Sequence, residues 1–143
     1  MLAYKSDIKL KASEVQLLLL QFNNSFDPHL QDKIDFSSYS DKLSTNALFI
    51  VASDDSIVGF IAYYVNERSH FLYVPLIAVQ TQYQRRRIGH NMMALLKRSL
   101  SKSIKNIYLE VAKSNHTAQE FYSREGFILA EDRNDKLLLS FSN

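Results

Sequence analysis

The segment from residue 71 to residue 111 limits the possible folds of this chain more than any other feature of its sequence. Phe71 to Val79 and Ile107 to Val111 are apolar, β-branched runs of the length typical of strands. Between them, apolar residues recur at the spacing of an amphipathic helix: Ile88, Met92, Leu95, Leu96 and Leu100. A helix that connects two strands predicts a parallel, right-handed β-α-β unit. The chain is therefore expected to fold as an α/β domain around a mixed sheet.

The remaining sequence supplies further helices and strands around this unit. Helical spacing predicts helices over Glu14 to Asn24, Phe36 to Leu43 and a segment that contains Ala118, Phe121 and Tyr122. Alternating or β-rich runs predict strands over Leu2 to Lys5, Leu48 to Ala52, Ile57 to Val65, Phe127 to Glu131 and Lys136 to Phe141. No repeat or linker divides these elements, so residues 1–143 are interpreted as a single domain.

Short motifs predict where several of these elements begin and end. Ser13-x-x-Gln16 resembles a capping box at the start of the first helix, and Asp27-Pro28 ends that helix. Thr117-x-x-Glu120 supports the start of the last helix, and Gly126 suits its C-terminal cap. Pro75 cannot donate to a strand ladder, so it predicts a bulge or local splaying in the strand that contains it.

Composition excludes several classes of protein. Of 143 residues, 46% are hydrophobic and 22% are charged, which excludes a disordered tail, a collagen-like fibre and a membrane protein. The chain has no cysteine, so disulfides and thiolate zinc sites are excluded, and its four histidines lack metal-binding spacing. The 17 basic and 15 acidic residues give a net charge of +2, too small to indicate nucleic-acid binding by the whole chain. No targeting signal or membrane span is recognised, which favours a cytoplasmic protein.

Arg85, Arg86 and Arg87 stand where the helix that begins near Ile88 has its N-terminus. The positive end of a helix disfavours cations by about 0.3–1 kcal/mol each, so three arginines there suggest that an anion binds. Gly89 would let a ligand approach the backbone closely. The alternative is a solvated basic turn without a ligand.

This segment resembles motif A of the GCN5-related N-acetyltransferases, whose pattern is Q/R-x-x-G-x-G/A. Gln84 fills the first position and Gly89 the last, but Arg87 replaces the middle glycine. A left-handed backbone at that position would make the arginine unfavourable by roughly 1–2 kcal/mol, whereas a position in the first helical turn would cost little.

A second segment resembles motif B of the same family. It contains a strand followed by an Asn, an Ala, an aromatic-Tyr pair and a Gly-Phe pair at the family's spacing: Ile107 to Val111, Asn115, Ala118, Phe121-Tyr122 and Gly126-Phe127. The two motifs cover about Leu72 to Phe127. The resemblance implies one mixed sheet of six to seven strands with about four helices packed on both faces. It also implies an N-acetyltransferase that transfers the acetyl group of acetyl-CoA to a primary amine in a ternary complex, without a metal.

The resemblance also implies how the acyl donor is held. Backbone amides from Arg85 to His90 would bind the pyrophosphate of acetyl-CoA, with Arg86, Arg87, Ile88 and Gly89 between them. The strand at Ile77, Ala78 and Val79 would pair with the pantetheine arm and offer an N–H to the acetyl oxygen. Asn115 would contact the cofactor, and it could equally serve as a helix N-cap.

Two residues are candidates for proton transfer. The resemblance makes Tyr122 the general acid that protonates the departing thiolate. Glu110 alternates with apolar neighbours in a strand predicted to lie in mid-sheet, and it resembles the proposed base of the bacterial ribosomal-protein N-terminal acetyltransferases. The alternative is a structural carboxylate bonded to nearby backbone amides.

Other functions and the acceptor stay open. One alternative is a family member that senses CoA without catalysis, which the exchange of glycine for Arg87 favours. Another is an anion-binding or nucleic-acid-binding module that combines the arginines with Lys97, Arg98, Lys102 and Lys105.

The acceptor amine is a small molecule or a peptide, with no nucleic-acid or membrane partner expected, and the protein is a monomer or a homodimer. The segment from Phe26 through Tyr39 to Leu43 is expected to cover the acceptor site. His70 and Tyr73 lie beside that site, although a surface histidine and a core-edge tyrosine are the favoured interpretations.

Overall fold

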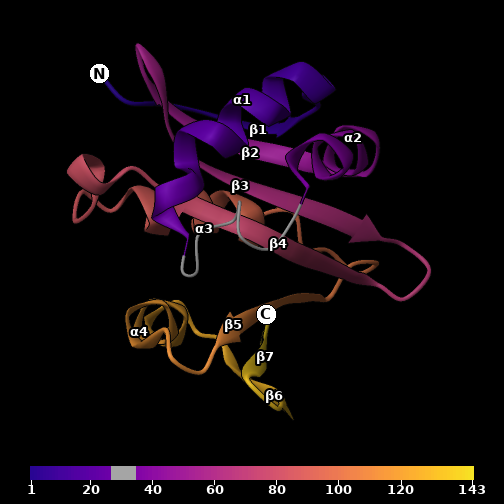
Figure 1. Cartoon of the computed structure of the whole chain (residues 1–143). Coiled ribbons are helices and arrows are strands. Elements are labelled where there is room, and N and C mark those ends of the chain that lie inside the picture. The colour runs from indigo at the N-terminus through magenta and orange to yellow at the C-terminus, as the bar shows by residue number, and fades with distance from the viewer. Residues whose placement is uncertain (27–34) are drawn as a thin grey trace.

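A computed structural model describes residues 1–26 and 35–143 and shows one seven-stranded sheet in this part of the chain (Figure 1). The strands are β1 (Ala3–Ile8), β2 (Leu48–Asp54), β3 (Ser56–Asn66), β4 (Phe71–Val79), β5 (Asn106–Ala112), β6 (Ile128–Arg133) and β7 (Lys136–Ser142). The helices are α1 (Ala12–Phe22), α2 (Phe36–Asn46), α3 (Ile88–Lys97) and α4 (His116–Arg124). The predicted mixed sheet of six to seven strands with about four helices is confirmed. The predicted helix end at Asp27-Pro28 lies outside the described residues.

The strand order is β1-β2-β3-β4-β5-β7-β6. β4 and β5 are parallel, and α3 connects them, which confirms the predicted parallel crossover. The other neighbouring pairs are antiparallel. β5 therefore lies inside the sheet, between β4 and β7, as predicted.

Pro75 lies in a bulge, as its missing N–H predicts. β3 and β4 are in register at Ala62–Leu76 and again at Tyr64–Tyr73, so two residues of β4 oppose one residue of β3. The extra residue reverses the alternation of side chains along β4. Val74, before the proline, packs in the core beside α3, whereas Leu76, after it, packs beneath α1 and α2.

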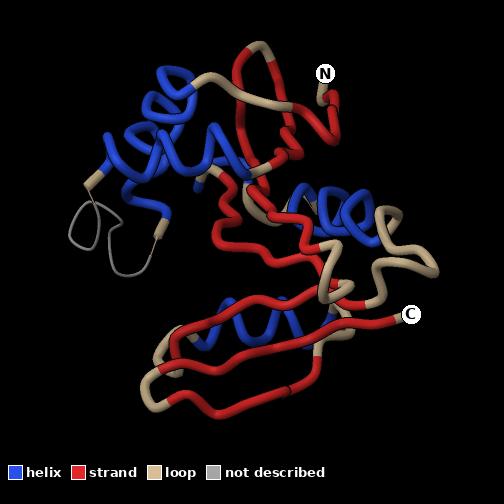
Figure 2. Tube along the Cα trace, turned by 90° about the vertical axis from the view of Figure 1, so that its right-hand side faces the viewer, coloured by secondary structure: helices blue, strands red, loops and turns tan. Residues whose placement is uncertain are grey.

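The two faces of the sheet carry separate apolar cores. One face packs against α1 and α2 around Phe22, Leu43 and Phe60. The other packs against α3 and α4 around Met92 and Tyr122. Figure 2 shows α1 and α2 on one side of the upper strands and α3 on the other. A fully buried Phe or Leu side chain contributes roughly 1.5–3 kcal/mol, so each core contributes substantially to the free energy of folding.

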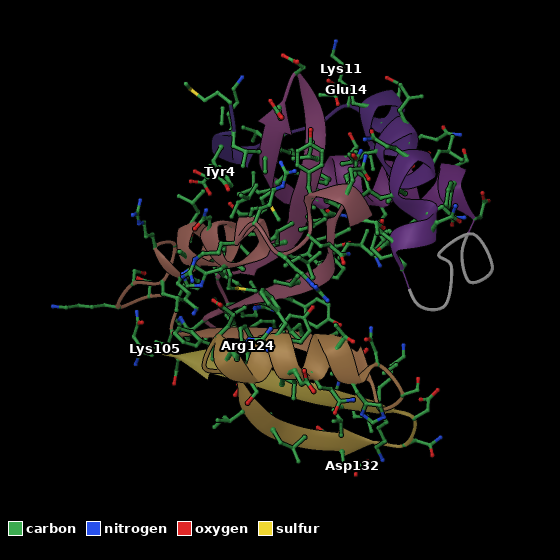
Figure 3. The ribbon with its side chains drawn as sticks, turned by 90° about the vertical axis from the view of Figure 1, so that its left-hand side faces the viewer. Tyr4, Lys11, Glu14, Lys105, Arg124 and Asp132 are labelled. Carbon is green, nitrogen blue, oxygen red and sulfur yellow. The ribbon has the colours of Figure 1, made fainter. Side chains whose placement is uncertain are left out.

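Ser13 and Thr117 do not cap α1 and α4 as their motifs predict, whereas the predicted alternative of Asn115 as a helix N-cap is confirmed. α1 begins at Ala12, and the Lys11 N–H donates to Glu14 Oε1 at 2.9 Å, so Ser13 and Gln16 form no capping box (Figure 3). In α4 the N-cap is Asn115, whose Oδ1 accepts from the Ala118 N–H at 3.2 Å, and Thr117 already lies inside the helix. In each case a side chain that satisfies a free backbone N–H fixes the first turn.

Other element ends differ by a few residues from the predictions. β6 runs to Arg133 and β1 to Ile8, because backbone pairing with a neighbouring strand continues through polar residues. Gly126 follows α4 with a φ of +94°, which confirms its predicted role at the C-terminal end. Among the helices of residues 1–26 and 35–143, none has both the length and the apolar character that crossing a bilayer requires.

Candidate active site

β4 and β5 separate at the point where the bulge lies. Their last registered pair is Val74–Leu109, and beyond it β5 pairs only with β7. Among residues 1–26 and 35–143, the edge of β4 from Ile77 to Val79 that faces β5 therefore has no strand partner. In Figure 1, β5, β6 and β7 with α4 form the block that lies below β4. The free backbone edge can pair with an extended ligand that carries amide groups.

The turn before α3 exposes consecutive backbone donors. Arg85 and Arg87 have φ values of 67° and 62°, and Arg87 is the N-cap of α3. Within the described part of the chain, none of the backbone N–H groups from Arg85 to His90 has a protein acceptor. We call these six N–H groups the cradle. The left-handed conformation costs a non-glycine residue roughly 1–2 kcal/mol, so Arg87 is strained, and the sequence alternative of an unstrained helical position is wrong.

Side chains around the cradle fix its position. Arg86 stacks over the Tyr83 ring, 5.0 Å from its centroid, and the Tyr83 hydroxyl donates to Asp54 Oδ2 at 3.1 Å. At Gly89, an added Cβ would lie 3.3 Å from the Phe121 ring of α4. The missing side chain at Gly89 thus lets the first turn of α3 pack closely against α4.

A buried carboxylate joins α3 to the end of α4. Glu125 Oε2 lies 2.7 Å from His90 Nδ1, and Glu125 Oε1 lies 3.1 Å from Lys97 Nζ. The Glu125 side chain is only 6% exposed. No sequence pattern predicts this cluster, because Glu125 lies far along the chain from His90 and Lys97. Because the charge of Lys97 is paired with Glu125, Lys97 contributes little to the basic patch that the nucleic-acid-binding alternative requires.

Tyr122 lies in the core on the α3 and α4 face of the sheet, 6% exposed. Its ring packs edge-on against Phe121 and Phe127. Burial raises the pKa of its hydroxyl, so the phenol is protonated at neutral pH. Asn115 uses Oδ1 to cap the same helix, which leaves its amide N–H groups to donate elsewhere.

Glu110 lies on the opposite face, because Leu109 and Val111 on either side of it belong to the core that contains Tyr122. It stands at the first position of β5 beyond the last pair with β4. Its Oε2 accepts from Arg133 Nη1 at 3.2 Å. The structural alternative of a carboxylate bonded to backbone amides is therefore not the observed arrangement. The two candidate proton-transfer residues therefore lie on opposite faces of the sheet.

The sequence pointed to Tyr73 and His70 beside the acceptor site but not to Arg133. Arg133, expected in a turn, is the last residue of β6 and also contacts Glu131 at 3.2 Å. Tyr73 is half-buried, and burial, then the charge of Glu110, raises the pKa of its hydroxyl. His70 is exposed in the turn before β4, with Nδ1 2.8 Å from the Ser103 carbonyl oxygen. Strand pairing brings Arg133 and Tyr73 to Glu110, and no spacing in the sequence signals that pairing.

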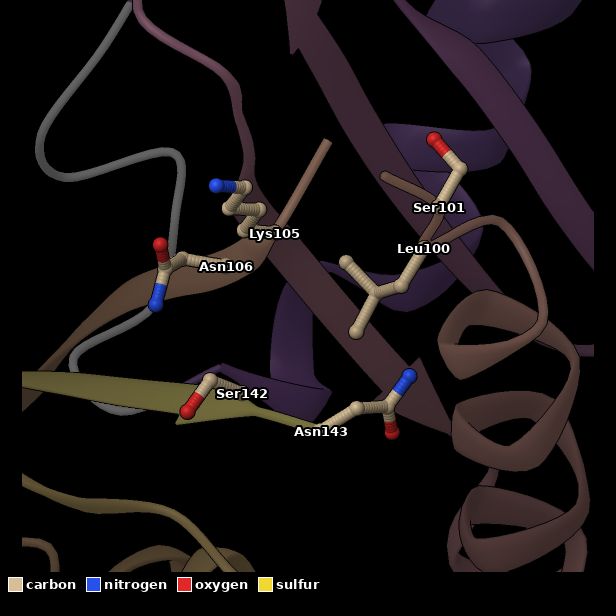
Figure 4. Close-up of a pocket in the computed structure, with 6 residues that line it drawn as sticks. All are labelled: Leu100, Ser101, Lys105, Asn106, Ser142 and Asn143. Carbon is tan, nitrogen blue, oxygen red and sulfur yellow. The ribbon is translucent and has the colours of Figure 1, made fainter. Parts of the chain in front are cut away.

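A separate pocket of about 310 Å³ lies at the opposite end of β5 from Glu110 (Figure 4). Its lining is Leu100, Ser101, Lys105, Asn106, Ser142 and Asn143. It is not part of the site between β4 and β5. Within residues 1–26 and 35–143, no group of three or more acidic, histidine or cysteine side chains is arranged to hold a metal ion.

Comparisons with known proteins agree with this geometry. The model of the acetyltransferase (GNAT) family matches residues 14–127. The PaiA N-acetyltransferase of Thermoplasma acidophilum, solved with coenzyme A, is 16% identical with a TM-score of 0.79 over 100% of this chain and 99% of its own. The ribosomal-protein-S18-alanine N-acetyltransferase of Escherichia coli is 19% identical, with a TM-score of 0.75 over 99% and 94%. Arabidopsis thaliana NAA60, solved with a bisubstrate analogue, is 16% identical, with a TM-score of 0.76 over 99% and 98%. No curated protein matches the sequence.

Proposed function

Because the chain belongs to the acetyltransferase (GNAT) family and is an acetyl-CoA-dependent N-acetyltransferase, we propose that it acetylates a primary amine by direct attack within a ternary complex. The observation that carries this proposal is the separation of β4 from β5 beside a turn with six free N–H groups. Acetyl-CoA needs both features, since it has a pyrophosphate and an extended arm with two amides. Its thioester supplies the activated acetyl group.

The residues present fit this donor. The cradle from Arg85 to His90 offers backbone hydrogen bonds at the positive end of α3, which suits a pyrophosphate. The free edge of β4 at Ile77, Ala78 and Val79 offers N–H and C=O groups to the pantetheine arm and an N–H to the acetyl oxygen. The Asn115 amide N–H groups are not used by the helix cap, which supports a role for them as donors to the same arm.

Proton transfer is assigned to two residues on opposite sides of the gap. Glu110 accepts a proton from the attacking ammonium, directly or through water, so that the neutral amine attacks. Tyr122 donates its phenolic proton to the departing thiolate, and its burial keeps that proton in place at neutral pH. The placement of the two side chains on opposite faces supports this division, because the amine approaches the thioester carbonyl from one side and the thiolate departs from the other.

Peptide or protein amines are acceptors consistent with two of the similar structures. One of these proteins is named for acetylating the alanine of a ribosomal protein, and another was solved with a bisubstrate analogue. The strained Arg87 favours a second candidate, a protein that binds CoA without turnover, since the family pattern has glycine there.

The test is a calorimetric titration of acetyl-CoA, followed by thiol release with a panel of primary amines. We expect micromolar binding that is clearly tighter than that of ATP, and saturation at 100 times Kd should add about 2.7 kcal/mol of stability. Thiol release with at least one amine, strongly reduced in Tyr122→Phe, supports the enzyme. Binding without turnover for any amine supports the CoA-binding alternative, and the absence of acetyl-CoA binding contradicts both.

A further inference from the structure

Two tyrosines of the sheet and one of α2 lie on the side of the sheet that carries Glu110. Tyr64 on β3 and Tyr73 on β4 are direct cross-strand partners, so their side chains lie on the same face. On its other side, Tyr73 registers with the residue of β5 that lies two positions before Glu110, which places Glu110 on that face too. Tyr39 of α2 packs against the same apolar cluster as Tyr64. We call Tyr39, Tyr64, Tyr73, Glu110 and Arg133 the acceptor wall.

The hydroxyl of Tyr64 is buried and has no hydrogen-bond partner within the described part of the chain. A buried hydroxyl without a partner costs about 1–3 kcal/mol, so its retention needs an explanation. Burial raises the pKa of Tyr39, Tyr64 and Tyr73, and each of these phenols is therefore neutral at neutral pH. The wall thus combines aromatic side chains with the Tyr64 hydroxyl, which makes no hydrogen bond within the described part of the chain.

Arg133 of the wall is shared between two carboxylates, Glu110 of the wall and the neighbouring Glu131. Arg133 contacts Glu131 at 3.2 and 3.4 Å but contacts Glu110 only once, at 3.2 Å. Leu138 of β7 is the register partner of both glutamates, so both lie on this face with one guanidinium between them. The Arg133 side chain is 41% exposed, and an exposed ion pair of this kind contributes only about 0–1 kcal/mol. A second cation can therefore replace Arg133 at Glu110 while Arg133 stays bound to Glu131.

We propose that the acceptor is a primary amine that binds as its ammonium at Glu110, in place of Arg133, with its adjoining carbons against the three tyrosines. Aromatic faces and a carboxylate both attract an ammonium group. An amine that carries a carboxylate on the neighbouring carbon would face Glu110 and Glu131 and is a poor acceptor. Arg133 is then a specificity-determining residue that competes with the acceptor. This inference rests on the proposed function and names the substrate class of that site.

Matched acceptors test the charge preference. Phenylalanine differs from phenethylamine only by its carboxylate. Alanine carries a charged carboxylate where alaninamide carries an uncharged amide. In each pair we expect the compound without the carboxylate to have a kcat/KM higher by about tenfold or more, since like charges brought together at a site are strongly unfavourable. Equal values, or a preference for the amino acids, would overturn the inference.

Arg133→Met tests the competition directly. We expect it to lower the KM for phenethylamine by about two- to fivefold, the weight of an exposed ion pair, with the Kd for acetyl-CoA unchanged. Lys113→Met is the matched control, because Lys113 pairs with Asp132 of the same hairpin at 2.6 Å and does not contact Glu110. A raised KM in Arg133→Met would contradict the proposal, since Arg133 would then help the acceptor to bind.

Tyr64→Phe tests the unpaired hydroxyl. We expect a higher KM for phenethylamine, because the Tyr64 hydroxyl would accept a hydrogen bond from the bound ammonium. We expect no lower melting temperature, because the substitution removes a buried hydroxyl that has no partner within the described part of the chain. Tyr63→Phe is the control: Tyr63 belongs to the opposite core and its hydroxyl donates to Asp7, so it should lose stability and keep its KM. A Tyr64→Phe protein with lower stability and unchanged KM would show a structural role instead.

The outcomes separate this inference from the proposed function. If acetyl-CoA binds but no amine releases the thiol, the proposed function fails, and the inference fails with it. If transfer occurs and amino acids are the better acceptors, only the inference fails.

Discussion

The cradle consists of consecutive residues, Arg85 to His90, and offers backbone groups to its ligand, whereas the acceptor wall takes side chains from α2, β3, β4, β5 and β6. Its hydrogen bonds need no particular side chain, because any residue except proline supplies the same N–H, although the packing of Gly89 on Phe121 and the left-handed backbone of Arg87 limit the residues at those two positions. The acceptor wall depends on the identity of each residue. Residues that are consecutive leave a motif in the sequence, whereas side chains gathered from five elements do not, so only the cradle half of the site could be recognised from a motif. Substitutions on the two sides should accordingly separate donor binding from acceptor chemistry.

Glu110→Gln should have the largest effect on activity and should leave the cradle intact. We expect kcat to fall by about 10²–10⁴-fold, the usual contribution of a positioned general base, while the Kd for acetyl-CoA stays the same. Steady-state kinetics and calorimetry measure the two quantities. Glu131→Gln is the control, because Glu131 shares Arg133 but lies on the edge strand. An unchanged kcat between pH 6 and 9 would exclude Glu110 from the mechanism.

Gly89→Val should damage the cradle and leave the acceptor wall intact. The new Cβ would meet the Phe121 ring at 3.3 Å, and the branched side chain adds more atoms there. We expect a loss of about 1–3 kcal/mol of stability, typical of overpacking, together with weaker acetyl-CoA binding. Gly89→Ala is the graded control, since Phe121 needs to move by only a few tenths of an ångström. A stable Gly89→Val protein with unchanged acetyl-CoA affinity would show that the close approach of α3 to α4 is unimportant.

Arg87→Gly tests the strain in the cradle. Removal of the left-handed arginine gains roughly 1–2 kcal/mol, and the greater freedom of glycine in the unfolded chain offsets about 0.5–1 kcal/mol of it. The expected result is a small net gain in stability in chemical denaturation. Arg87→Lys keeps the charge and the strain, so it should show no gain. A clear loss of stability in Arg87→Gly would mean that the arginine side chain makes contacts that outweigh its backbone strain.

Alkaline titration compares the buried tyrosine with the half-buried ones. Burial raises the pKa of Tyr122 in the folded state above its unfolded value near 10. Stability from this group is therefore fully present below pH 10 and declines above it, as the unfolded chain releases the proton first. Tyr122→Phe should reduce the slope of stability against pH above 10, and Tyr64→Phe should reduce it less. Equal slopes for wild-type protein and Tyr122→Phe would contradict the burial of that hydroxyl.

Much of the fold could be predicted from local patterns. The β4-α3-β5 crossover followed from apolar periodicity, and the bulge at Pro75 followed from the missing N–H. Helix starts were harder. Ser13 and Thr117 are good capping types, yet Lys11 and Asn115 occupy the caps, because the position of each helix along the chain is set by packing as well as by its first turn.

The sequence alone determined the turn before α3, the tyrosine of α4 and the glutamate inside the sheet, since each depends on neighbours within a few residues. Only the tertiary structure decided that Arg87 is left-handed, that Glu125 joins His90 to Lys97, and that Arg133, Tyr64 and Tyr73 surround Glu110. Strand register and the reversal of side chains at Pro75 make these contacts, and both depend on pairing between segments far apart in the sequence. Residues that meet across paired strands have no fixed spacing along the chain, so a sequence pattern cannot predict their contacts.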